Sequence, residues 1–140
     1  MLRDSSDDFS FSGLKTSVRY FLRDHPDVLS DGQQIRDLCA SVQAAIVEVL
    51  VTKTLRAANK IGVTCVTASG GVTCNRCLRT RLLEACQSDS LDLHLAEPSL
   101  CTDNAAMIGI LAERKLRLGF PSTVEDDEAR PSWGLDEGRA

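Results

Sequence analysis

Two short motifs hold the residue types that could do chemistry in this chain. The first is SGGVTCN at 69–75, which follows a β-branched run and precedes a helical pattern. Glycines at such a turn permit positive φ and let a ligand approach the backbone, and the next helix offers free N–H groups. Gly70 and Gly71 could therefore bind an anionic or polar ligand. The alternative is that they serve only the geometry of the turn, as in many strand-to-helix connections.

Asn75 closes this motif and has two possible roles. Its side chain can cap the following helix, or its amide can bind a purine base or a ribose. Capping is the more common role for an Asn at a helix start. From the residues alone, nucleotide binding by Asn75 is therefore the second interpretation.

The other motif is CTDNAAM at 101–107, where Asp103 opens an unusually apolar helix. A carboxylate is a good ligand for a hard or borderline cation, whereas an Asp at a helix start is most often an N-cap. The residues 105–108 leave no polar face, so we expect this helix start to be buried. A buried carboxylate needs a partner, which favours a metal ligand.

Cys74 and Cys77 form a CxxC motif at the start of the helix after the glycines, which is where a redox thiol of low pKa would lie. A thiol-redox protein is thus the main rival interpretation. It leaves the glycines and Asn75 without a role, and no second cysteine pair completes a zinc site. His25 and His94 are not at helical spacing, and we expect neither to be a ligand.

Composition limits the possible classes of protein. With 140 residues, 43% apolar and 26% charged, the chain matches one ordinary soluble domain. Residues 121–140 carry the whole net charge of −4 and show no periodicity, so we expect an acidic disordered tail. The neutral remainder argues against DNA binding. No uninterrupted apolar run approaches the roughly 20 residues that span a membrane, and the early acids argue against a signal peptide.

Periodicity predicts the elements that position these motifs. Apolar spacing and the boundary residues Pro26, Asp31 with Gln34, and Gly62 indicate two helices in the first half of the chain. A β-branched run and a strictly alternating segment indicate a buried strand and a half-buried strand. The predicted order is helix 13–25, helix 31–60, strand 63–68, helix 75–86, strand 91–95 and helix 103–118. The middle of this order is a βαβ unit with parallel strands.

Four segments, in order, resemble one family. Residues 8–16 read DFSFSGLKT as in that family, and 40–45 read ASVQAA where it has ASFQEA. Residues 70–79 read GGVTCNRCLR, similar to its GGVxxNxxLR, and 101–108 read CTDNAAMI, similar to its CTDNxAMI. The family is that of the tRNA N6-adenosine threonylcarbamoyltransferases, formerly named O-sialoglycoprotein endopeptidases. The carbamoyltransferases of hydrogenase maturation share the GGVxxN turn but differ at 101–107.

The resemblance implies an α/β fold of the actin-like ATPase (sugar kinase/Hsp70) superfamily, with residues 8–120 as the C-terminal lobe. It implies that Asn75, with Gly70 and Gly71, binds an adenine nucleotide, and that Asp103 is one ligand of an iron-type divalent metal. The implied reaction transfers a threonylcarbamoyl group from the ATP-derived threonylcarbamoyl-adenylate to N6 of adenosine 37 in tRNA. The metal would orient and polarise the carbamoyl group. Implied partners are tRNA and paralogous and ATPase subunits, in the cytoplasm.

The sequence also departs from the family. The family's histidine pair, its N-terminal phosphate loop and its SGGHT segment are absent, and Met1 lies where the family is in mid-protein. We expect a truncated frame, a mis-called start or half of a split gene. The alternative to an enzyme part is a non-catalytic fragment or interaction module. Faces that normally meet another lobe would be exposed, so we expect self-association.

Overall fold

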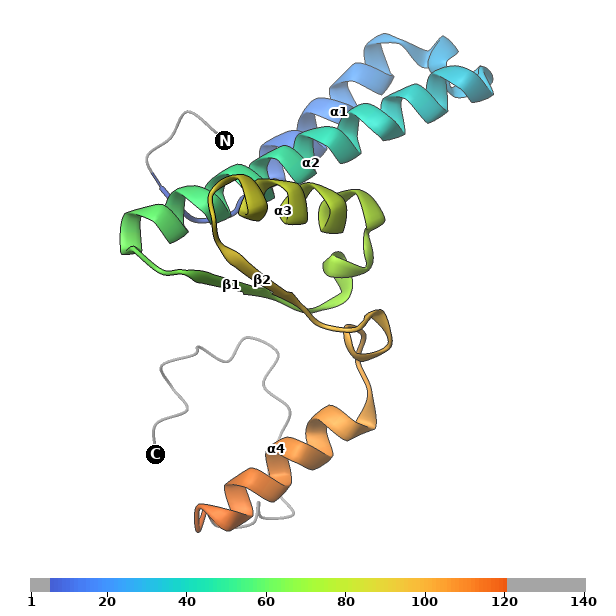
Figure 1. Cartoon of the computed structure of the whole chain (residues 1–140). Coiled ribbons are helices and arrows are strands. Elements are labelled where there is room, and N and C mark those ends of the chain that lie inside the picture. Colours follow the sequence, from blue (N-terminus) through green and yellow to red (C-terminus); the bar gives the residue numbers. More distant parts are fainter. Residues whose placement is uncertain (1–5, 121–140) are drawn as a thin grey trace. The chain divides into compact units, whose positions relative to one another are not determined.

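The computed structural model describes residues 6–120, and Figure 1 shows its helices and strands in chain order. The chain divides into two units, 1–102 and 103–140, of which the second contains one described helix. The predicted acidic tail lies outside the described residues. The elements are α1 (Ser12–Asp24), the 3-10 turn η1 (Pro26–Ser30), α2 (Gly32–Ile61), β1 (Cys65–Ala68), the 3-10 turn η2 (Gly71–Cys74), α3 (Arg76–Ser88), β2 (Asp92–Leu95), the 3-10 turn η3 (Pro98–Leu100) and α4 (Ala105–Arg117).

The first unit is built on a βαβ unit, as predicted. β1 and β2 pair in parallel, with Cys65 opposite Asp92 and Ala68 opposite Leu95, and α3 connects them. Helices α2 and α3 lie on the same face of this two-stranded sheet (Figure 1). The α/β class with long helices is therefore confirmed.

The core of the first unit lies between the two helices and the sheet. Val47 and Val51 of α2 pack against Leu78 and Leu82 of α3, and apolar residues of both strands adjoin them. A second cluster joins α2, β1 and the end of α3, and consists of Ala58, Val66 and Cys86. These contacts hold α3 in place, and with it the turn that precedes α3.

The prediction of a fully buried first strand is wrong. In β1 only Val66 is buried, while Cys65 and Thr67 are exposed. The reason is that, among the described residues, helices cover one face of the sheet only, so that alternate side chains face outward. The prediction for β2 is confirmed, because its Leu93 and Leu95 are partly buried.

The ends of α2 match the sequence signals. Asp31 accepts hydrogen bonds from the N–H groups of Gln33 and Gln34, and Gly62 ends the helix with φ 75°. The sequence expectation that no segment could cross a membrane is too strict, because α2 has the length and hydropathy to do so. That expectation counted uninterrupted apolar runs, whereas mean hydropathy tolerates scattered polar residues. The same test is passed by core helices, and Lys53 of α2 is only 3% exposed.

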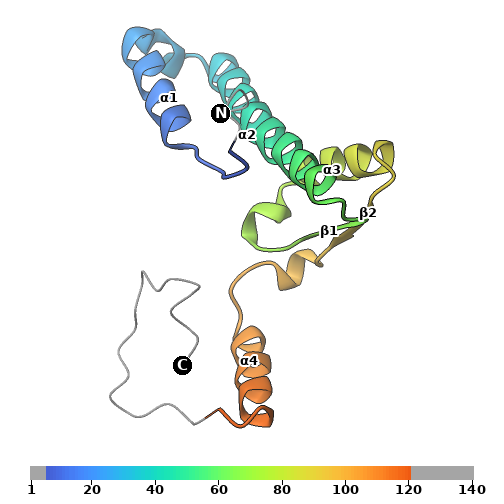
Figure 2. The ribbon, with the colours of Figure 1, turned by 90° about the vertical axis from the view of Figure 1, so that its left-hand side faces the viewer.

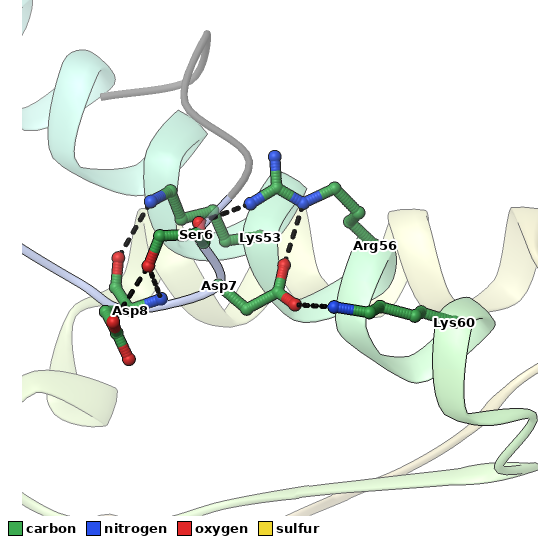
Figure 3. A network of polar contacts seen from close by, with 6 residues as sticks. All are labelled: Ser6, Asp7, Asp8, Lys53, Arg56 and Lys60. Carbon is green, nitrogen blue, oxygen red and sulfur yellow. Dashed lines mark hydrogen bonds and ion pairs between the residues drawn. The ribbon is translucent and has the colours of Figure 1, made fainter.

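The segment before α1 is attached to the second half of α2 by charged side chains (Figure 3). The Asp7 carboxylate lies 2.9 Å from Nε of Arg56 and 3.0 Å from Nζ of Lys60. Lys53 donates from Nζ to the carbonyl oxygen of Asp8 at 2.7 Å. Hydrogen bonds from Lys60 and Arg56 lower the pKa of Asp7 below its usual value. This attachment fixes the start of the DFSFSGLKT motif.

Acid is expected to release this segment from α2. Because the folded-state pKa of Asp7 is lowered, its contribution is present above the ordinary value of 3.8 and is lost as the pH falls through the lowered pKa. In NMR spectra recorded from pH 7 to pH 2, the resonances of residues 6–8 should move toward unfolded-chain positions as the pH falls through that range. Asp7→Asn should show those positions at every pH. Asp27→Asn, at an exposed carboxylate, is the control, and an Asp7→Asn chain whose residues 6–8 keep the wild-type resonances would contradict the assignment.

Candidate functional site

The turn between β1 and α3 contains the glycines singled out by the sequence. Gly70 has φ 94° and ψ 165°, a conformation that is open to glycine and strained for other residues. Its carbonyl oxygen accepts from the N–H of Thr73 at 2.9 Å and from the Thr73 hydroxyl at 2.7 Å. Positive φ is confirmed at Gly70. It is not found at Gly71, which begins the 3-10 turn and has open space where a Cβ would be.

Asn75 is the N-cap of α3. Its Oδ1 accepts from the N–H of Leu78 at 3.0 Å, and its Nδ2 donates to Oε1 of Gln43 on α2 at 2.9 Å. The capping interpretation is thus confirmed. The amide group carries two N–H donors, so the bond to Gln43 leaves one of them for a ligand.

The turn borders an apolar groove of about 880 Å³ within the first unit. Its lining residues come mainly from α1, α2, η2 and the start of α3. Figure 2 shows that α1 and α2 are connected at one end, where η1 lies. Representative apolar lining residues are Leu22, Val42 and Val72, and the amide side chains in the lining are Gln43 and Asn75. An apolar groove with a few placed polar groups suits a flat heterocycle such as a purine.

A second set of contacts behind the turn was not predicted from the residues. Arg79 of α3 donates to the carbonyl oxygens of Thr73 and Ala96, each at 3.1 Å. The Thr73 hydroxyl also lies 3.2 Å from Sγ of Cys101, and both of these residues are buried. Sequence signals for this set were present, because Arg79 and Cys101 belong to the two motifs that resemble the family.

Asp103 is placed differently from our expectation. The last helix begins at Ala105, and its N-cap is Asn104, whose side chain accepts from the N–H of Met107 at 3.2 Å. Asp103 itself is exposed, and so is most of α4, which has no buried residue. The expected burial of this helix start is therefore not found, because an apolar segment is buried only where another surface covers it, and α4 contains no buried residue.

A metal ion needs several ligating side chains that lie close together. Across residues 6–120, no three His, Cys, Asp or Glu side chains lie close enough to hold an ion together. The described residues therefore do not form a metal centre by themselves, and Asp103 could provide only one ligand of such a site.

The CxxC cysteines differ in their surroundings. Cys74 is exposed, while Cys77 is partly buried against the core between α2 and α3. Both are free thiols, as are the other four cysteines of the chain. Cys86 is fully buried, and this burial raises the pKa of its thiol, which keeps it protonated and unreactive.

A parallel βαβ unit with a glycine turn after its first strand defines an α/β protein of the kind that binds ligands beyond the strand ends. The family model described as tRNA N6-adenosine threonylcarbamoyltransferase matches residues 2–110, and the chain belongs to this family.

Curated relatives agree with this assignment. Proteins named tRNA N6-adenosine threonylcarbamoyltransferase from Geotalea uraniireducens and Geobacter metallireducens are 43% and 46% identical over 136 residues, which is 97% of this chain. A relative of the same name from Syntrophotalea carbinolica is 39% identical over 137 residues. The chain spans 39–40% of the length of these relatives.

Proposed function

We propose that residues 8–120 form the C-terminal lobe of an actin-like enzyme that transfers a threonylcarbamoyl group from threonylcarbamoyl-adenylate to N6 of adenosine 37 in tRNA. The N6 amine attacks the carbamoyl carbon, and the bond from this carbon to the phosphate oxygen breaks. AMP leaves with the electron pair, and N6 loses one proton. The observation that carries the proposal is the glycine-specific conformation of Gly70 beside the apolar groove, in a chain of this family.

The chain's own part in this reaction is to hold the adenylate. The groove would take the adenine ring between apolar side chains, with the amide groups of Gln43 and Asn75 at its edge. The open space at Gly71 lets the ligand approach the backbone, and the start of α3 favours the negatively charged phosphate. Asn75 thus has two tasks, which are to cap α3 and to orient the nucleotide.

Asp103 is proposed as one ligand of an iron-type divalent metal. The other ligands would have to come from segments other than the described residues, since these contain no group of three suitable side chains. The near-neutral balance of residues 1–120 indicates that tRNA is bound largely by other parts of the enzyme or by paralogous and ATPase partner subunits. We place the protein in the cytoplasm with them.

A chimera tests the proposed function. In the Geobacter metallireducens relative, the matching 136-residue segment is replaced by this chain, and the chimera is expressed in cells that lack their own transferase. Mass spectrometry of tRNA nucleosides should detect N6-threonylcarbamoyladenosine, as it should with the unaltered relative. No modified nucleoside from a stable, soluble chimera would overturn the proposal.

Substitutions at Asn75 separate its two tasks in this chimera. Asn75→Ser keeps an oxygen acceptor for the cap but loses the amide, so helix stability should be retained while the modification falls about tenfold or more. Asn75→Ala should lower both the stability of the helix and the level of modification. Full modification by Asn75→Ser would show that Asn75 only caps α3.

A non-catalytic interaction module is the second candidate, and the exposed apolar side chains of α4 favour it. Ile108 and Leu116 are 69% and 63% exposed. Light scattering of the isolated chain should give a mass above the 15.2 kDa of a monomer, because such a surface associates in water.

Replacing Ile108 and Leu116 together by Lys should lower that mass. Ile61→Lys, at a residue of α2 that is 73% exposed, is the matched control and should not change it. A monomeric wild-type chain, or an equal effect of Ile61→Lys, would count against α4 as an interaction surface.

A further inference from the structure

The side chain of Arg79 connects three separate segments of the first unit. Its Nη1 donates to the carbonyl oxygens of Thr73 and Ala96 at 3.1 Å, and its Nη2 donates to Ala96 at 3.1 Å. Ala96 directly follows β2, and its N–H donates to the carbonyl oxygen of Ala68 at the end of β1. Arg79 therefore links both strand ends to the turn that lies between β1 and α3.

Thr73 connects Arg79 to Gly70 through its own hydrogen bonds. The N–H and the hydroxyl of Thr73 both point to the Gly70 carbonyl oxygen, at 2.9 and 2.7 Å. Thr73 is 6% exposed, and Cys101, 4% exposed, contacts its hydroxyl from the other side with Sγ at 3.2 Å. The conformation of Gly70 thus depends on a buried residue that is itself held by Arg79 and Cys101.

Geometry distinguishes Arg79 from a simple positive charge. In the part of the chain that the structure describes, no carboxylate lies within ion-pair distance of Arg79, and its bonds go to main-chain carbonyl oxygens. A planar guanidinium can donate to two carbonyl oxygens at once from a fixed fork. A lysine ammonium has the same charge but is a compact point charge on a flexible stem.

We propose that Arg79 is a positioning residue, whose forked hydrogen bonds, together with Thr73, hold the Gly70–Asn75 turn in the conformation that binds nucleotide. The proposal rests on the proposed nucleotide binding by this turn. Gly70 has a conformation that only glycine adopts readily, and the two bonds from Thr73 to the Gly70 carbonyl oxygen hold it there. Arg79 bonds to the carbonyl oxygen of this same Thr73, so its restraint acts on the residue that fixes the turn.

Amide hydrogen exchange of the full chain without ligand tests the restraint directly. Arg79→Lys should increase exchange at residues 71–75 about tenfold or more, which is the effect of losing charge-assisted hydrogen bonds. Arg81→Lys, at an exposed arginine of the same helix, should leave exchange unchanged. Unchanged protection of the turn in Arg79→Lys, with an intact core, would overturn the proposal.

Variants of Thr73 provide a second test of the restraint, in which no charged residue is replaced. Thr73→Ser keeps the hydroxyl bond to Gly70 and should keep the protection of the turn, while the similarly sized Thr73→Val should lose it. Equal protection in both variants would contradict the role of the hydroxyl. Protection at α2 and the middle of α3 shows in each case that the variant is folded.

Titration with AMP links the restraint to binding and separates the two proposals. Arg79→Lys should weaken AMP binding about tenfold or more, and Arg81→Lys should not. A wild-type chain that binds no AMP overturns the proposed nucleotide site, while the exchange data still decide whether Arg79 restrains the turn. Faster exchange in Arg79→Lys with unchanged AMP affinity would overturn its role in binding.

Discussion

Replacing Gly70 by Ala is expected to abolish most of the nucleotide binding of the turn while the core remains folded. With φ 94° and ψ 165°, the backbone at this position is strained for any residue with a Cβ, at a cost of about 1–3 kcal/mol. No atom lies within 4 Å of the added Cβ, so the effect comes from the backbone conformation and not from a clash. The turn should relax and lose about 10- to 100-fold in AMP affinity.

Gly71→Ala is the matched control for this prediction. Gly71 has no positive φ, and an added Cβ there also meets nothing within 4 Å, so the protein should fold normally. In isothermal titrations with AMP, Gly70→Ala should be the weaker binder of the two. If Gly71→Ala lowered the AMP affinity more than Gly70→Ala, close approach of a ligand to Gly71 would matter more than the conformation at Gly70. Equal, wild-type affinity of both variants would show that the turn does not bind AMP.

Replacing Leu82 by Ala is expected to give the largest loss of stability in the chain. Leu82 is 4% exposed and packs with Val47, Val51 and Leu78 between the two main helices. Removing a buried leucine side chain typically costs about 2–5 kcal/mol, which combines the lost transfer free energy with that of the cavity. This is a large part of the stability of a small domain. Urea denaturation followed by circular dichroism should show the loss in the unfolding midpoint.

The neighbouring Leu83 provides the control, because it has the same side chain on the same helix but is 47% exposed. Leu83→Ala should lower the free energy of unfolding by less than about 1 kcal/mol. A similar loss in the two variants would mean that the face of α3 toward Leu83 is also covered in solution. Self-association through that face would explain such a result, since association buries exposed apolar surface.

The elements of this chain were largely predictable from local signals. The boundary residues of α2, Asp31 at its start and Gly62 at its end, predicted the extent of this helix correctly, because capping depends on neighbouring backbone groups. The parallel pairing of β1 with β2 followed from the order of a strand, a helix and a strand. The positive φ at Gly70 was also predictable, because a glycine between a strand and a helix is typical of such a turn.

Burial was the property that local signals predicted poorly. β1 and the start of α4 are apolar enough to be core elements, yet Cys65, Thr67 and Asp103 are exposed. The sequence reports that a segment can be buried, whereas burial itself requires a partner surface. Among the described residues, helices cover only one face of the sheet, so the outward side chains of β1 have no such surface.

The amino-acid sequence by itself determined the helices, the βαβ unit and the family, since each depends on spacing within one segment or on the order of segments. Only the tertiary structure decided that Asn75 bonds to Gln43 and that Arg79 reaches both Thr73 and Ala96. These contacts join residues 6 to 32 positions apart, and no local pattern encodes which of many distant polar groups will meet. They form because packing α2 and α3 on the sheet brings the strand ends and the turn together, where their polar groups must find partners.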